Sequence, residues 1–98
     1  MGLRGYRIPC MFFMVIEHFI PGSIALIGER FKRSGRMLPE GVSYHTSWVD
    51  SNETRCFQIM EAANPELLRN WTTQGDDLIK FEIVPVEASA DFWARARG

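Results

Sequence analysis

The fold of this chain is decided by a dense apolar run, Met11-Phe-Phe-Met-Val-Ile-Glu-His18, which Pro21-Gly22 closes. A run of about eight residues that ends in a turn signal has the length of a β-strand rather than of a helix. Its apolar residues occupy both alternating positions, and a strand of this kind is usually covered on both faces. We therefore expect residues 11–18 to form a central strand of a sheet.

A helix is predicted directly after this strand. Ser23 is placed to cap it, and Ile24, Ile27 and Phe31 recur at the spacing of one buried stripe. Gly35 can end the helix, because glycine readily adopts the left-handed conformation found after helices.

The second half of the chain predicts a hairpin, a helix and a strand. Residues 42–50 and 54–62 are rich in β-branched and aromatic side chains on either side of a turn-rich tetrapeptide, which indicates a β-hairpin. Asn64-Pro65-Glu66 is a typical helix start, with a capping side chain, a proline at the first helical position and an acid in the first turn. Residues 78–86 alternate between apolar and charged side chains and predict the last strand.

The ends of the chain lie outside this pattern. Residues 1–10 carry no periodicity and are interpreted as an N-terminal extension outside the core. Residues 11–86 are interpreted as the folded α+β domain. Residues 87–98 are interpreted as a C-terminal tail with a short helix around Phe92-Trp93.

The order of these elements is strand, helix, strand, strand, helix, strand, which predicts an α+β domain of the ferredoxin-like βαββαβ type. In that fold a four-stranded antiparallel sheet has the first and third strands at its centre and both helices on one face. Parity within the strands assigns Phe13, Phe57 and Phe81 to the helix-covered face, and Met14, Cys56 and Gln58 to a second, apolar face seeded with polar groups. The facing of residues 42–50 stays open, because Tyr44 and Trp48 share one parity while His45 and Val49 share the other. An uncovered apolar face of this size predicts a homodimer.

Composition excludes several classes of function. The net charge is −1, with eleven basic and twelve acidic residues, so we expect no nucleic-acid partner. No apolar run approaches the ~20 residues that span a bilayer, and we expect no membrane partner. Cys10 and Cys56 show no metal-ligand spacing, which indicates reduced thiols in a cytoplasmic protein without a metal site. No cofactor motif is present, and no cofactor is expected.

Several blocks of the sequence resemble a family of short bacterial proteins that is described only as a domain of unknown function. They are Phe13-Met-Val-Ile-Glu17, Gly35-Arg-Met-Leu-Pro-Glu-Gly41, Ser47-Trp-Val49, Arg55-Cys-Phe-Gln-Ile-Met-Glu61 and Phe81-Glu-Ile-Val-Pro-Val86. The resemblance covers residues 11–86 and implies a member of the dimeric α+β barrel superfamily, a homodimer whose two sheets form a shared barrel. It implies no particular reaction. Gly75 departs from it, because a second tryptophan is expected at that position.

The topology brings one set of chemically versatile side chains to a single edge of the sheet. They are His18, Trp48, Cys56, Gln58 and Lys80. The candidate ligand-binding residues are His18, Tyr44, Trp48, Cys56 and Gln58. His18 is a candidate general base, because an imidazole exchanges protons near neutral pH, and the alternative is a hydrogen bond at a strand end. Gln58 requires a partner for its amide, either a ligand or the other subunit.

Other polar residues have plainer interpretations. Glu17 and Glu61 are expected at opposite ends of the sheet, as solvated strand ends rather than as a catalytic pair. The one basic cluster, Arg30, Lys32, Arg33 and Arg36, is interpreted as a solvated helix face, with anion binding near Gly35 as the alternative.

Two hypotheses follow. The first is a homodimer that binds a small organic molecule in a sheet-lined cavity, and the second is a non-enzymatic interaction dimer without a ligand cavity. A cavity of about 300 Å³ or more with convergent polar groups favours the first. Whether any reaction is catalysed is left open.

Overall fold

The computed structural model describes residues 10–97, which contain one four-stranded sheet and three helices. The elements in chain order are β1 (Met11–Phe19), α1 (Ile24–Ser34), β2 (Val42–Val49), β3 (Arg55–Ala62), α2 (Pro65–Thr72), β4 (Ile79–Val86) and α3 (Ser89–Ala96). The predicted extension over residues 1–10 lies outside the described residues except for Cys10.

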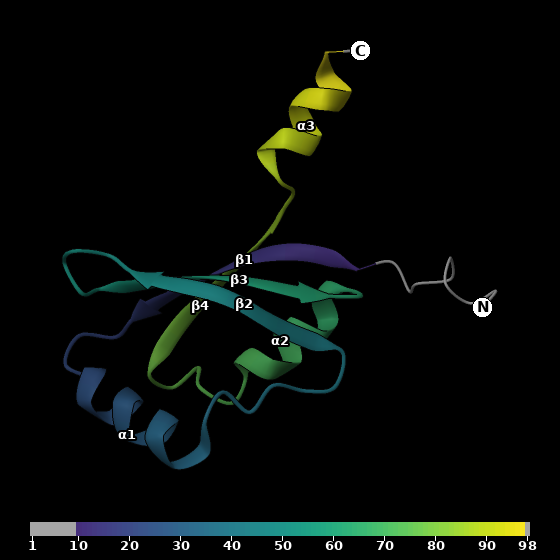
Figure 1. Ribbon diagram of the computed structural model, residues 1–98. Helices are drawn as coiled ribbons and strands as arrows, with labels where there is room; N and C mark the ends of the chain where they lie inside the picture. The colour runs from purple at the N-terminus through teal and green to yellow at the C-terminus, as the bar shows by residue number, and fades with distance from the viewer. Residues whose placement is uncertain (1–9, 98) are drawn as a thin grey trace.

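The four strands form one antiparallel sheet in the order β2-β3-β1-β4. The prediction that the first and third strands lie at the centre of the sheet is therefore confirmed. Helices α1 and α2 cover one face of the sheet, and α3 stands away from the opposite side (Figure 1). The α+β class is confirmed, and the short helix predicted around Phe92-Trp93 is α3.

The two sheet-covering helices begin differently. Asn64 caps α2 as predicted, because its side-chain oxygen accepts a hydrogen bond from the backbone N–H of Leu67 at 3.2 Å. Ser23 precedes α1, but the prediction that its side chain caps the helix is wrong. The Ser23 hydroxyl instead donates to the carbonyl of Leu78 at 3.2 Å and ties the start of α1 to the loop before β4. Gly35 ends α1 with a φ of 65°, as expected, and its N–H donates to Phe31.

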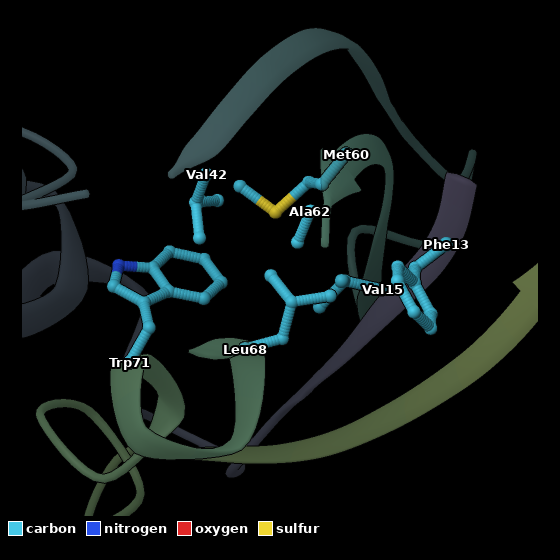
Figure 2. Close-up of a cluster of buried hydrophobic side chains, with 7 residues drawn as sticks. All are labelled: Phe13, Val15, Val42, Met60, Ala62, Leu68 and Trp71. Carbon is cyan, nitrogen blue, oxygen red and sulfur yellow. The ribbon is translucent and has the colours of Figure 1, made fainter. Parts of the chain in front are cut away.

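The core lies under α2. Seven apolar side chains, none with more than 8% of its surface exposed, meet there (Figure 2). They are Phe13 and Val15 of β1, Val42 of β2, Met60 and Ala62 of β3, and Leu68 and Trp71 of α2. Leu68 and Trp71 sit one helical turn apart, so α2 presents both to the sheet.

Replacing Leu68 by alanine is expected to lower the free energy of unfolding by about 2–5 kcal/mol, because Leu68 is fully buried and the change leaves a cavity in the core. Urea denaturation measures this loss. Leu26→Ala on α1 is the matched control, since Leu26 is 59% exposed and its loss should change stability by about 0.5 kcal/mol or less. Equal effects for the two variants would place the core elsewhere.

In contrast to α2, α1 packs loosely on the sheet. The prediction that Ile24, Ile27 and Phe31 form a buried stripe is wrong, because no residue of α1 is buried. Ile24 is 50% exposed and Phe31 is 48% exposed. The reason is that α1 leaves a cavity between itself and the sheet, and Ile27 and Phe31 line that cavity instead of filling it.

The predicted facing of β3 is also wrong. In the β1–β3 ladder Phe13 lies opposite Met60 and Val15 lies opposite Gln58, and residues directly opposite each other share a face. Gln58 and Met60 therefore point toward the helices rather than to the open face. Parity misassigned β3 because Phe57 and Ile59 are at least as apolar as their even-numbered neighbours. The register with β1, rather than hydrophobicity, decides which of the two sets faces the helices.

A β-bulge in β2 resolves the strand whose facing the sequence left open. The register shifts between Tyr44, which lies opposite Met60, and Thr46, which lies opposite Ile59. The extra residue inverts the alternation downstream of it. Tyr44 consequently faces the helices and Trp48, opposite Phe57, faces the open side, although the two residues share one parity.

Candidate functional site

A cavity of about 110 Å³ lies between α1 and the sheet, next to the end of β1. Its walls are largely aromatic and aliphatic: Ile27 and Phe31 come from α1, Trp71 from α2, and Phe81 from β4. Glu17 of β1 contributes a carboxylate to this lining. A polar group thus meets an apolar pocket, which is the usual composition of a small-molecule site.

Glu17 follows Phe13 and Val15 on the helix-covered face of β1, and it is half-buried rather than solvated as the sequence suggested. Its carboxylate accepts a hydrogen bond of 2.7 Å from the side-chain nitrogen of Gln58. Burial raises the pKa of Glu17 above the ordinary 4.5, and the Gln58 hydrogen bond and the charge of Arg36 offset only part of that rise. The partner of the Gln58 amide is therefore a carboxylate of the same chain.

Arg36 lies at the cavity on the loop after α1. Its guanidinium carbon is 3.6 Å from the ring centroid of Tyr44 and 5.1 Å from that of Phe31. Its backbone carbonyl accepts a 2.7 Å hydrogen bond from the indole N–H of Trp71. These contacts fix both the loop and the cation, so Arg36 is not simply part of a solvated helix face.

Three further polar side chains lie on the same helix-covered face. Tyr44 and Ser47 share a hydrogen bond of 2.7 Å between their hydroxyls. Cys56 lies opposite Glu17 in the ladder, and burial and the Glu17 charge raise the pKa of its thiol. A thiol held protonated in this way is a poor nucleophile.

Gly75 explains why the cavity is open at the loop before β4. It lines the cavity, and a Cβ added at this position would lie 3.7 Å from the ring of Phe81, in ordinary van der Waals contact. A β-carbon is therefore tolerated at this position. Glycine stands here in place of the tryptophan expected from the resemblance, and both Gly75 and Glu17 line the cavity.

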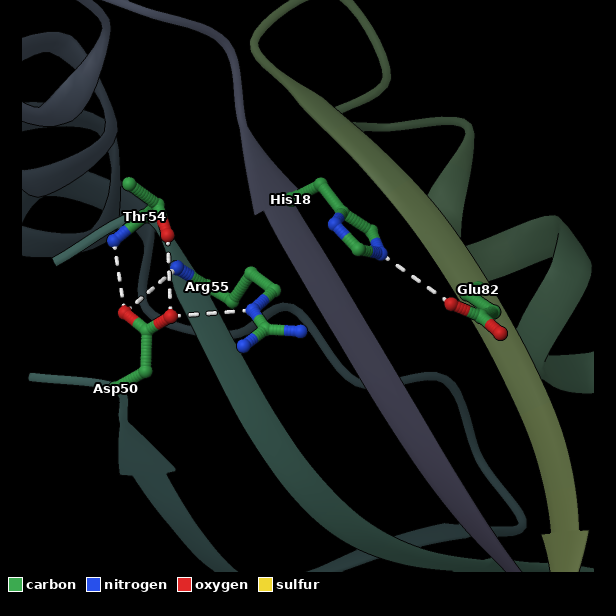
Figure 3. Close-up of polar contacts among 5 residues, drawn as sticks. All are labelled: His18, Asp50, Thr54, Arg55 and Glu82. Atoms are coloured by element: carbon green, nitrogen blue, oxygen red, sulfur yellow. Dashed lines mark hydrogen bonds and ion pairs between the residues drawn. The ribbon is translucent and has the colours of Figure 1, made fainter. Parts of the chain in front are cut away.

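The open face of the sheet carries the other two predicted site residues. Nε2 of His18 lies 3.3 Å from a carboxylate oxygen of Glu82 on β4, which can accept a hydrogen bond from it (Figure 3). Trp48 is 60% exposed. The structure divides the five predicted residues between the two faces of the sheet. Tyr44, Cys56 and Gln58 lie with Glu17, whereas His18 and Trp48 do not.

Glu61 lies at the opposite end of β3 from Cys56 and faces the open side. Its carboxylate is bonded to His45 at 2.9 Å. The expectation that Glu17 and Glu61 form no carboxylate pair is confirmed, since register separates them along the strand and by face. Within residues 10–97, no group of three or more His, Cys, Asp or Glu side chains is arranged to hold a metal ion.

The turn between β2 and β3 is held by Asp50 (Figure 3). Its carboxylate accepts hydrogen bonds from the backbone N–H and hydroxyl of Thr54, at 2.9 and 3.0 Å, and from the guanidinium of Arg55 at 3.1 Å. These bonds, led by the Thr54 N–H, lower the pKa of Asp50 to about 2.

Asp50→Asn is expected to lower the thermal midpoint at neutral pH, because an amide cannot reproduce all of these acceptor bonds. The folded-state pKa is depressed, so this stabilisation is present above the ordinary value of 3.8 and is lost as the pH falls toward 2. Thermal unfolding between pH 2 and pH 7 should show the two proteins converging at the acid end. Asp76→Asn, in an exposed loop, is the control. A constant difference across the range would contradict this role.

The family model described as "Domain of unknown function (DUF3303)" matches residues 11–97. The chain belongs to this family. The resemblance seen in the sequence is thereby confirmed, and the match extends beyond residue 86 to include α3. No curated protein and no solved structure matches the chain significantly.

The candidate site of this DUF3303 chain was indicated only in part by the sequence. Glu17 was detectable in principle, since it is the one charged residue on the parity of Phe13 and Val15. The sequence named Arg36 only as part of a basic cluster, and it did not indicate the aromatic walls of the cavity. The positions of both depend on how α1 and its following loop lie over the sheet. None of the described helices is long and apolar enough to cross a membrane.

Proposed function

We propose that this protein binds a small organic molecule in the cavity beside Glu17. The observation that carries the proposal is a carboxyl group on the core-facing side of a central strand, bonded to Gln58 and bordering an aromatic pocket. A carboxylate has about four acceptor positions, and the hydrogen bond from Gln58 occupies one of them. A ligand that donates a hydrogen bond would occupy another.

The size of the cavity narrows the ligand class. At about 110 Å³ it does not reach the volume of about 300 Å³ expected of a cavity that encloses a whole small molecule, so it takes only a small ligand or part of a larger one. An apolar cavity of about 150 Å³ is known to hold benzene. The ligand portion inside is therefore a single ring or a group of similar size, with its hydrogen-bond donor toward Glu17. The raised pKa of Glu17 also suits proton exchange with such a donor.

Phenol is the probe that tests this proposal, with ¹⁵N-labelled protein and amide chemical shifts as the readout. Phenol is expected to bind with a dissociation constant of about 1 mM and to shift amides around Glu17, Phe31 and Phe81. Amides around Trp48 on the open face should not move. Gly75→Trp should abolish the shifts by filling the cavity while leaving Glu17 in place. Shifts that are absent, or that persist in Gly75→Trp, would overturn the proposal.

We further propose that the fold is ferredoxin-like and that the protein is a homodimer. The order of elements and the central position of β1 and β3 support the first statement. The open face of the sheet supports the second, because it carries apolar side chains that are exposed or half-buried in a single chain. They are Phe12, Met14, Ile16, Trp48, Phe57, Ile59, Val84 and Val86.

The free thiols of Cys10 and Cys56 support a cytoplasmic location.

The dimer and the ligand site are independent proposals. The apolar open face and the cavity lie on opposite sides of the sheet, so a second copy can cover the first without filling the second. Cys56 and Gln58 lie on the cavity side, so the open face is more uniformly apolar than the sequence suggested.

A further inference from the structure

Every residue of helix α3 is exposed in the part of the chain that the structure describes, residues 10–97. None of its residues is buried, and its two large side chains, Phe92 and Trp93, are 40% and 57% exposed. Their rings pack against each other edge to face with centroids 4.9 Å apart, which forms a small apolar surface. The helix stands away from the sheet, on the side opposite to α1 and α2 (Figure 1).

An isolated helix of this length is not stable in water. Helices shorter than about 12–15 residues are marginal without tertiary contacts, and α3 has 8 residues. A local ion pair lies at its start, because the two terminal nitrogens of the Arg95 guanidinium each donate to the Glu87 carboxylate at 2.8 Å. Exposed ion pairs of this kind contribute little stability. The described residues of its own chain leave α3 exposed, so its apolar surface is open to contact with another molecule.

We infer that α3 packs against the second copy of this chain in the homodimer, as an arm exchanged between the two subunits. This inference rests on the proposed dimer through the open sheet face. The second copy is the occupant that the structure favours, because α3 and the uncovered apolar face lie on the same side of the sheet. The family model also spans α3, so the helix lies within the matched length of the domain.

Dimensions support the exchange. Stacked sheets lie about 10 Å apart, and an 8-residue helix is about 12 Å long. Only Glu87 and Ala88 separate β4 from α3, and Ala88 is extended. A helix that leaves the sheet on the interface side over so short a connection reaches the layer of the partner subunit. A two-fold axis then buries both copies of Phe92 and Trp93 at once.

Sedimentation equilibrium tests the energetic contribution of the arm. The double variant Phe92→Ser/Trp93→Ser is expected to raise the dimer dissociation constant about 10–100-fold relative to the wild type. Ala94→Ser on the same helix is the matched control and should leave it within about threefold. A wild-type dimer with an unchanged dissociation constant in the double variant would overturn the arm but keep the dimer. A wild-type protein that is still monomeric at about 100 µM would overturn both the arm and the dimer.

Paramagnetic relaxation separates exchange from a contact within one chain. One chain is prepared without ¹⁵N, carries Cys10→Ser and Cys56→Ala, and bears a spin label on the cysteine of Arg97→Cys. It is mixed with ¹⁵N-labelled wild-type chain. Line broadening in the ¹⁵N-labelled chain is expected, because the label then lies on the other subunit. A mixed dimer whose ¹⁵N-labelled chain shows no broadening would overturn the inference.

Discussion

Met14→Lys is expected to raise the dissociation constant of the dimer by at least about 100-fold and to leave a folded monomer. Met14 lies on the open face at the centre of the sheet, opposite Ile59 on one side and Val84 on the other. A lysine there places an unpaired ammonium in the proposed interface, once from each subunit. Burying such a charge costs several kcal/mol, and about 1.4 kcal/mol corresponds to a factor of ten.

Analytical ultracentrifugation across a range of concentrations measures this effect. Leu26→Lys provides the matched control, since Leu26 is 59% exposed on α1 and lies on the other side of the sheet. Far-ultraviolet circular dichroism should be unchanged in both variants, because Met14 is only half-buried in a single chain. A Met14→Lys protein that remains as tightly dimeric as the wild type would show that the open face is not the interface.

Glu17→Gln is expected to stabilise the fold at pH 8 and to weaken ligand binding. Burial raises the pKa of Glu17 above 4.5, so the folded state holds the proton more tightly than the unfolded state. The stability that this proton contributes is complete below pH 4.5 and is lost as the pH rises through the folded-state pKa. Glutamine can still accept the hydrogen bond from Gln58 without a charge to desolvate.

Thermal unfolding of Glu17→Gln between pH 4 and pH 8 tests this account. The variant and the wild type should have similar midpoints near pH 4, and the variant should be the more stable protein at pH 8. Glu29→Gln, an exposed change on α1, should give no such gain. A variant that is less stable than the wild type at pH 8 would mean that the Glu17 carboxylate supports the fold. The buried charge of Glu17 would then not be a destabilising feature that is kept for ligand binding.

Local sequence signals were sufficient to predict the elements of this fold. The apolar run at residues 11–18 and the cap at Asn64 mark β1 and α2, and both depend on short-range chemistry. The central position of β1 and β3 then followed from the order of the elements. Ser23 shows where this reasoning fails, because its hydroxyl bonds Leu78, a residue 55 positions away, rather than its own helix.

The site was harder to predict because it depends on register. Counting parity within β3 assigned Gln58 to the wrong face, and a one-residue bulge between Tyr44 and Thr46 separated Tyr44 from Trp48. Neither fact is encoded in one strand alone, since both belong to a pairing of two strands. The cavity could not be predicted from strand pairing either, because it exists only where α1 covers the sheet without filling the space next to Glu17.

The central claim is that Glu17 receives a hydrogen bond from a ring-sized ligand in this cavity. Isothermal titration calorimetry with phenol and with anisole, its methyl ether, tests the claim most directly, because the two share a ring and differ in the donor. A hydrogen bond to a charged group contributes about 1.5–3 kcal/mol, so the wild type should bind phenol about 10–100-fold more tightly than anisole. In Glu17→Ala the two ligands should bind about equally. Equal affinities in the wild type, or a preference for phenol that persists in Glu17→Ala, would contradict the claim.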